Sequence, residues 1–199
     1  MIDRRPDFTR AAAQLVSVVE QIRDDQWDLP GLGEWTVREL VGHALRGVQT
    51  TAAYLDVPAE VATLGSPGEY FRRALATPDL HAVVARRGRE AGVALGDDPL
   101  ATVRSEVDTA VARVAAADPG DIMTVVGGTI ALADYLPTRI FEIVVHTDDL
   151  CRALGLHSPA TPELVTQAIG TALDSQSPEF GLDVLRRVTG RAGEPGPFG

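Results

Sequence analysis

Apolar residues recur at three- and four-residue intervals along most of the chain, which is the period of an α-helix with one buried face. This pattern predicts helices over residues 7–25, 37–55, 69–91, 100–117, 131–155, 161–175 and 180–188. Glycine and proline clusters separate them, as in the Leu-Pro-Gly-Leu-Gly run that begins at Leu29. Residues 122–128 fit either a short extended segment or a loop. Because strands and helices do not alternate, we predict an all-α bundle.

The longest segment, from Ala131 to Gly155, has the least usual pattern. At about 100° per residue, its central polar side chains fall on one narrow stripe, which consists of Arg139, Glu142, His146 and Asp149. The remaining faces are almost entirely apolar, so this helix is expected at the centre of the bundle. Burying a carboxylate and an imidazole there is costly unless they pair or bind a ligand. The stripe is therefore the best candidate for a functional site.

His43, in another predicted helix, is a further candidate for this site. Thr36 and Glu39 have the spacing of a capping box, which places the start of that helix at Val37 and His43 close to its apolar face. Glu142 and His146 are four residues apart, a spacing that is also typical of a simple ion pair.

Together, the three side chains His43, Glu142 and His146 offer two imidazoles and one carboxylate, the ligand set of zinc sites that keep one coordination position open. Zinc suits this set first, with nickel, iron or manganese as alternatives. The hypothesis requires the His43 imidazole to lie within about 8 Å of the other two groups, because ligand bonds are far shorter than that.

Length, charge and cysteine content limit the kinds of protein that this sequence can encode. The chain has 199 residues, enough for one sizeable core, and 28 acidic residues against 18 basic ones, which argues against a nucleic-acid or anionic-membrane partner. No apolar run approaches the roughly 18 residues of a membrane span, and the first residues lack the apolar core of a signal peptide. Cys151 is the only cysteine, so an internal disulfide is excluded, and we expect a cytoplasmic protein.

The predicted elements fit a single domain. We expect it to cover residues 1–189, with a core at about 8–155 and a helical extension at 161–189. The glycine- and proline-rich residues 190–199 are expected to form a flexible tail. Cys151 is expected to pack rather than react, because it lies about 200° around the helix from Asp149.

Two motifs resemble a known family. One is Glu34-Trp-Thr-Val-Arg-Glu-Leu-Val-Gly-His43, and the other is Arg139…Glu142…His146…Asp149-Leu150…Leu154-Gly155. Their order and separation resemble the DinB-like, mycothiol-dependent maleylpyruvate isomerase superfamily over roughly residues 8–155. The resemblance implies a four-helix bundle, here with additional C-terminal helices, and a divalent metal held by His, Glu and His.

Position by position, the resemblance implies His43, Glu142 and His146 as the metal ligands. Asp149 matches a family aspartate near the metal, which implies a role in thiol cosubstrate binding and in catalysis. Arg139 matches a frequent arginine one turn before the glutamate, and either an active role or a structural ion pair fits that position.

The implied chemistry uses mycothiol as a thiol cosubstrate and a small electrophile as the substrate. The thiolate could add and leave again, which isomerises a double bond, or stay attached, which is S-transfer. Arg46 could bind the cosubstrate or an anionic substrate, or form a salt bridge, and Asp134 and Tyr135 could line the pocket.

Other interpretations of the sequence are open. The isomerases carry a separate C-terminal α/β domain, whereas residues 156–199 read as helices and a tail, so isomerisation of maleylpyruvate itself is not expected. The rival hypotheses are a non-catalytic metal- or ligand-binding stress or regulatory protein of the same fold, and a structural bundle with a vestigial site. Either a monomer or a homodimer fits.

Overall fold

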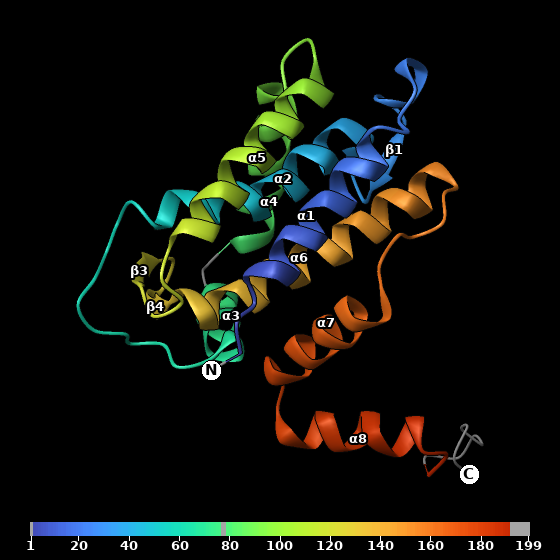
Figure 1. The fold of residues 1–199 in the computed structure, drawn as a ribbon. Coiled ribbons are helices and arrows are strands. Elements are labelled where there is room, and N and C mark those ends of the chain that lie inside the picture. Colours follow the sequence, from blue (N-terminus) through green and yellow to red (C-terminus); the bar gives the residue numbers. More distant parts are fainter. Residues whose placement is uncertain (1, 77–78, 192–199) are drawn as a thin grey trace.

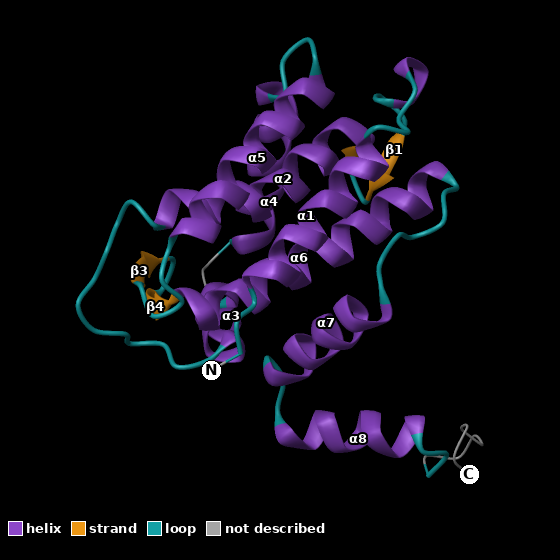
Figure 2. Ribbon diagram, in the orientation of Figure 1, coloured by secondary structure: helices purple, strands orange, loops and turns teal. Residues whose placement is uncertain are grey.

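The structure is a computed structural model that describes residues 2–76 and 79–191. Its helices are α1 (Arg5–Val19), α2 (Val37–Tyr54), α3 (Pro67–Leu75), α4 (Leu80–Ala94), α5 (Pro99–Ala116), α6 (Leu132–Leu154), α7 (Pro162–Asp174) and α8 (Pro178–Val188) (Figure 1). Two short antiparallel pairs accompany them, β1 (Pro30–Leu32) with β2 (Trp35–Thr36) and β3 (Ile122–Val125) with β4 (Gly128–Ala131) (Figure 2). The predicted all-α class is confirmed. Within the described residues, no helix is long and apolar enough to cross a membrane.

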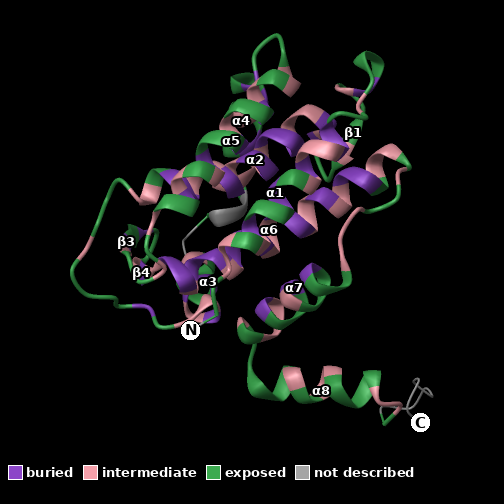
Figure 3. Cartoon of the chain, in the orientation of Figure 1, coloured by how far each residue is buried: buried purple, intermediate pink, exposed green. Residues whose placement is uncertain are grey.

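Helix α6 lies at the centre, as its apolar pattern predicts. It packs against α1, α2 and α7, while α2 also packs against α4 and α5 and α1 against α5. Ile140, Ile143 and Leu150 of α6 are fully buried in this core, and Figure 3 shows buried residues along the facing sides of the bundle helices. The bundle formed by α1, α2, α5 and α6 therefore has the DinB-like arrangement that was predicted.

Local interactions fix the position of α2. The Thr36 hydroxyl accepts from the Glu39 backbone N–H at 3.2 Å, and the Glu39 carboxylate accepts from the Thr36 N–H at 2.9 Å, which confirms the predicted capping box. At Gly47 a Cβ atom would lie 3.6 Å from Cβ of Glu142, so α2 and α6 approach closely at that level. This close approach allows side chains of the two helices to share one site.

The structure corrects the boundaries of the first predicted helix. The helix predicted over 7–25 ends at Val19, and a 3₁₀ turn at Asp24–Gln26 follows it. The Gln26 side chain accepts from the Arg23 backbone N–H at 3.0 Å, so the turn satisfies its own backbone groups instead of continuing the helix.

The helix predicted over 69–91 is in fact two helices, α3 and α4. Pro78 is the sequence signal for the break that the prediction missed, since proline cannot continue the hydrogen-bond ladder. For residues 122–128, the extended alternative was the right one, and Gly127 makes the tight turn between β3 and β4 at φ +87°.

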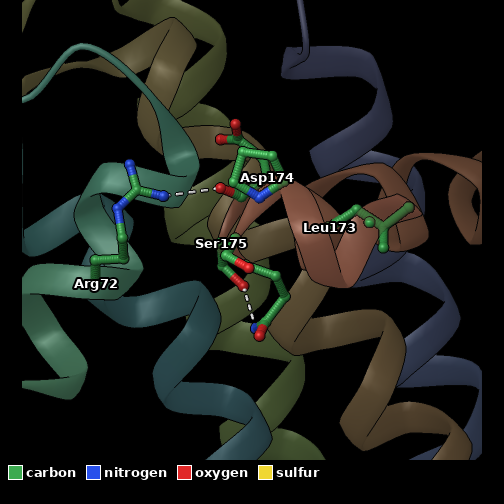
Figure 4. A pocket seen from close by; sticks show the side chains of 8 residues that line it. Arg72, Leu173, Asp174 and Ser175 are labelled. Atoms are coloured by element: carbon green, nitrogen blue, oxygen red, sulfur yellow. Dashed lines mark hydrogen bonds between the residues drawn. The ribbon is translucent and has the colours of Figure 1, made fainter. Parts of the chain in front are cut away.

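The predicted extension is helical and consists of α7 and α8. The end of α7 is tied to α3 through Asp174, whose carbonyl accepts from Arg72 at 2.9 Å (Figure 4). The Asp174 carboxylate also accepts from the Gly68 N–H at 2.6 Å. Helix α8 has no buried residue and stands away from the bundle (Figures 1 and 3). Of the predicted tail, residues 192–199 lie outside the described part of the chain.

Candidate metal centre

Helices α2 and α6 bring His43, Glu142 and His146 together. One candidate ligand atom from each side chain lies within 4.8 Å of the other two. The imidazole ring centroids of His43 and His146 are 4.7 Å apart, well inside the limit of about 8 Å that the hypothesis required. The predicted convergence of three side chains from two helices is therefore present, and the metal itself stays a prediction.

His43 has an apolar setting. Its ring lies 4.5 Å from the Trp35 ring, centroid to centroid, and the Trp35 indole N–H donates to the Ala85 carbonyl at 3.1 Å. Its Nδ1 atom is buried and has no hydrogen-bond partner among the described residues. Burial, aided by the charge of His146, lowers the pKa of His43 to about 4. His43 is thus a neutral imidazole at neutral pH, which is the form that binds metals.

His146 has the opposite setting, between two carboxylates of its own helix. Its Nδ1 lies 3.1 Å from Oδ2 of Asp149, and its Nε2 lies 3.4 Å from Oε2 of Glu142. Burial acts to lower the pKa of His146, but the hydrogen bonds to Asp149 and Glu142 outweigh it and raise the pKa to about 9.

The Glu142 carboxylate is held ionised by the same contacts. Burial acts to raise its pKa, but the hydrogen bond with His146 and the charge of Arg139 outweigh burial, so the pKa is lowered. Two imidazoles and an ionised carboxylate form a donor set that suits zinc and accepts nickel, iron or manganese. The orphaned nitrogen of His43 is a buried polar atom for which a bound cation would supply a partner, so the residues fit a metal.

A cavity of about 270 Å³ borders the triad between α2, α3, α4 and α6. Besides His43 and Glu142, its wall carries three guanidinium groups and three phenol rings, from Arg46, Arg87, Arg139, Tyr54, Tyr70 and Tyr135. Tyr135 lines this cavity, as expected, whereas Asp134 does not, and Arg46 lies in the same wall.

Arg139 is the least usual member of this wall. It is 9% exposed, and its guanidinium carbon lies 5.4 Å and 5.0 Å from the ring centroids of Tyr70 and Tyr135. Among the described residues, no carboxylate lies within 4.0 Å of Arg139 or of Arg46, so the ion pairs considered for them are not formed there. A buried cation without a paired anion is costly, which makes the cavity suited to an anionic ligand.

A second, more open hollow of about 490 Å³ meets the triad from the side of Trp35. His43, Glu142 and His146 all line it, together with Leu32 and Glu34 of the loop that precedes α2. His43 and Glu142 therefore separate two hollows, a cationic one and a more open, largely apolar one, and His146 lines only the second.

Several residues of this site were missed from the sequence. Tyr54, Tyr70 and Arg87 lie on three different helices, and no local pattern indicated that their side chains meet. Trp35 is part of the Trp-Thr motif, but the motif did not indicate that its ring contacts a candidate ligand.

Asp149 and Cys151 lie apart from both hollows. Asp149 lines a third hollow, between α6 and α7, with Val144 and Ile169. Cys151 is buried, and burial raises the pKa of its thiol, as expected for a packed rather than a reactive cysteine.

Comparison with known proteins identifies a family. A family model described as the mycothiol maleylpyruvate isomerase N-terminal domain matches residues 8–151, a stretch that includes all three candidate ligands. No curated protein and no solved structure matches the chain.

Proposed function

Since the chain belongs to the DinB-like family of mycothiol maleylpyruvate isomerase N-terminal domains, we propose that it is a metal-dependent enzyme that uses mycothiol to act on a small anionic electrophile. The observation that carries this proposal is the convergence of His43, Glu142 and His146 beside a cavity whose wall contains three arginines. The buried guanidinium of Arg139 packs on two tyrosine rings, and an anionic ligand would supply the paired charge that it lacks among the described residues.

The three side chains would hold a divalent ion, zinc first and nickel as the alternative. Bound there, the ion would stabilise a coordinated thiol as its thiolate and so supply a nucleophile at neutral pH. His43 is already neutral and Glu142 already ionised, so both are in the state that a ligand needs.

The cationic cavity, the one of about 270 Å³ between α2, α3, α4 and α6, is the proposed binding site of the electrophile. Arg139, at its inner wall, and Arg46 would bind and orient the negative groups of the substrate and stabilise charge that develops during the reaction. The tyrosine rings would cover its apolar part and exclude water. Isomerisation and S-transfer both begin with attack of the thiolate on the bound electrophile, and both belong to the proposal.

The open hollow beside Trp35 is the proposed entrance for mycothiol, which is bulkier than a small electrophile. Its wall includes all three candidate ligands, so a thiol that enters there reaches them directly.

The proposal is tested first by metal content and then by turnover. After reconstitution with zinc or nickel, we expect about one ion per chain in the unchanged protein and in His157→Ala, and much less in His146→Ala. His157 is the matched control, because it is an exposed histidine in the loop after α6. Substoichiometric metal in the unchanged protein would rule out the proposal.

Turnover is measured with mycothiol and pairs of electrophiles. In each pair, one member carries a carboxylate and the other carries the corresponding neutral amide. We expect mycothiol-dependent consumption of the carboxylate members. Tight metal binding without turnover of any pair would favour the non-catalytic binding protein instead.

A further inference from the structure

We propose that Asp149 is a positioning residue, which orients His146 and fixes the ring nitrogen that His146 presents to the metal. This assigns Asp149 a different role from the cosubstrate binding and catalysis that the family resemblance implies. The inference rests on the metal site of the proposed function and not on its reaction.

The first support is the geometry around the His146 ring. Asp149 follows His146 by three residues on α6, and its carboxylate Oδ2 lies 3.1 Å from Nδ1. The opposite ring nitrogen, Nε2, is the one that faces Glu142, at 3.4 Å. A neutral imidazole has one N–H and one lone pair, so an N–H donated from Nδ1 to Asp149 leaves the lone pair on Nε2, the nitrogen that faces Glu142.

The second support is where Asp149 lies. It lines the hollow between α6 and α7, whereas the two hollows that border the triad are lined by other residues. Its side chain is only 16% exposed, and its partner is the ring of His146. His146 lines only the hollow beside Trp35, so a ligand there would meet its ring, whereas Asp149 lines the hollow between α6 and α7.

The third support is the contrast with His43. The His43 ring is held by packing on Trp35, and its buried Nδ1 has no hydrogen-bond partner among the described residues. His146 is thus the ligand whose orientation is set by a hydrogen bond. Carboxylates behind a ligating histidine fix its tautomer and raise its basicity, and their loss costs about 10–100-fold in metal affinity.

The experiment measures zinc affinity by competition with a chromophoric chelator, in the unchanged protein, Asp149→Ala, Asp149→Asn and Asp148→Asn. Asp148 is the matched control, because it precedes Asp149 on α6 and lines the same hollow. We expect a loss of up to about 100-fold in Asp149→Ala, a loss of about tenfold in Asp149→Asn, and an unchanged affinity in Asp148→Asn. The partial effect of asparagine is expected because its carbonyl can still accept from Nδ1–H, although it carries no charge.

A second readout separates positioning from general damage to the fold. Nitrogen-15 NMR of the zinc-loaded unchanged protein is expected to show His146 protonated on Nδ1, and Asp149→Ala is expected to show a mixture of tautomers. The Tm of each metal-free variant, followed by circular dichroism, shows whether the bundle is intact.

The outcomes are distinct. Zinc affinity in Asp149→Ala equal to that of Asp148→Asn would overturn the positioning role, and so would full affinity combined with lost turnover, which is the signature of cosubstrate binding or proton transfer. Equal losses in Asp149→Ala and Asp148→Asn, with a lowered Tm in both, would also overturn it. Failure of the unchanged protein to bind zinc would remove both this inference and the proposed function.

Discussion

The two histidines of the triad, His43 on α2 and His146 on α6, have opposite environments. On α2, His43 lies in an apolar wall against Trp35, and burial lowers its pKa to about 4. On α6, His146 lies between two carboxylates that raise its pKa to about 9. One ligand is therefore held neutral by packing, and the other is oriented by hydrogen bonds. The contrast indicates that the site tolerates small changes differently on its two sides.

Removal of a ligand should produce the largest effect. Replacing His146 by alanine removes a candidate ligand and leaves Glu142 and Asp149 without their shared partner. We expect the loss of zinc affinity, measured by chelator competition, to exceed the loss of about 10–100-fold that follows removal of a residue that supports a ligand. His43→Ala should be as damaging to zinc binding. If only one of the two variants lost zinc, the two halves would not belong to one site.

The opposite pKa shifts predict how the stability of the metal-free protein depends on pH. The unfolded pKa of histidine is about 6.5. Between pH 6.5 and about 4 the unfolded chain binds a proton that buried His43 does not, so stability falls as the pH falls through this window. Between pH 6.5 and about 9 folded His146 keeps a proton that the unfolded chain loses, so stability falls as the pH rises. Stability should therefore be greatest near pH 6.5.

Each of these two losses of stability, on the acid and on the alkaline side, corresponds to about 3 kcal/mol in the free energy of unfolding. The measurement is urea unfolding of chelator-treated protein at about pH 4.5, 6.5 and 9.5, on either side of the unfolded pKa of histidine. In His146→Gln the loss of stability above pH 6.5 should disappear, and the loss below pH 6.5 should remain but shrink, because the charge of His146 no longer helps to lower the pKa of His43. In His43→Gln the loss of stability below pH 6.5 should disappear and the loss above pH 6.5 should remain. A profile that is flat from pH 6.5 upward in the unchanged protein would contradict the assignment of the proton to His146.

The environment of His146 can be predicted from the sequence more completely than that of His43. The polar stripe of α6 is a local pattern, so the spacing of Glu142, His146 and Asp149 could be read directly, and the three-residue step from His146 to Asp149 already placed them side by side. The setting of His43 depends on how Trp35 and α4 pack against α2, which no local period encodes. For the same reason the cavity wall contributed by Tyr54, Tyr70 and Arg87 could not be predicted.

A smaller effect is expected from two of the three arginines of the cationic cavity, one on α6 and one on α2. Arg139 of α6 is buried, whereas Arg46 of α2 is only half-buried. For a carboxylate electrophile, Arg139→Met should lower kcat/KM by about 10–100-fold, which corresponds to a charge-assisted hydrogen bond of about 1.5–3 kcal/mol. Arg46→Met should lower it less.

The stability of Arg139→Met provides the control, because methionine fills similar space without a buried charge. Its free energy of unfolding should be unchanged or higher. Equal kcat/KM values for the carboxylate substrate in Arg139→Met and the unchanged protein would exclude the anion-binding role.

The smallest expected effect tests the packing of His43 directly. Trp35→Phe keeps an aromatic ring near His43 but removes the indole N–H that donates to the Ala85 carbonyl at 3.1 Å. Loss of that bond should cost about 1 kcal/mol in the free energy of unfolding. Zinc affinity should fall less than in Asp149→Ala, since the ring that positions His43 is still present. A larger loss of zinc in Trp35→Phe than in Asp149→Ala would mean that packing on the α2 side, and not the hydrogen bond on the α6 side, determines how well the site is preorganised.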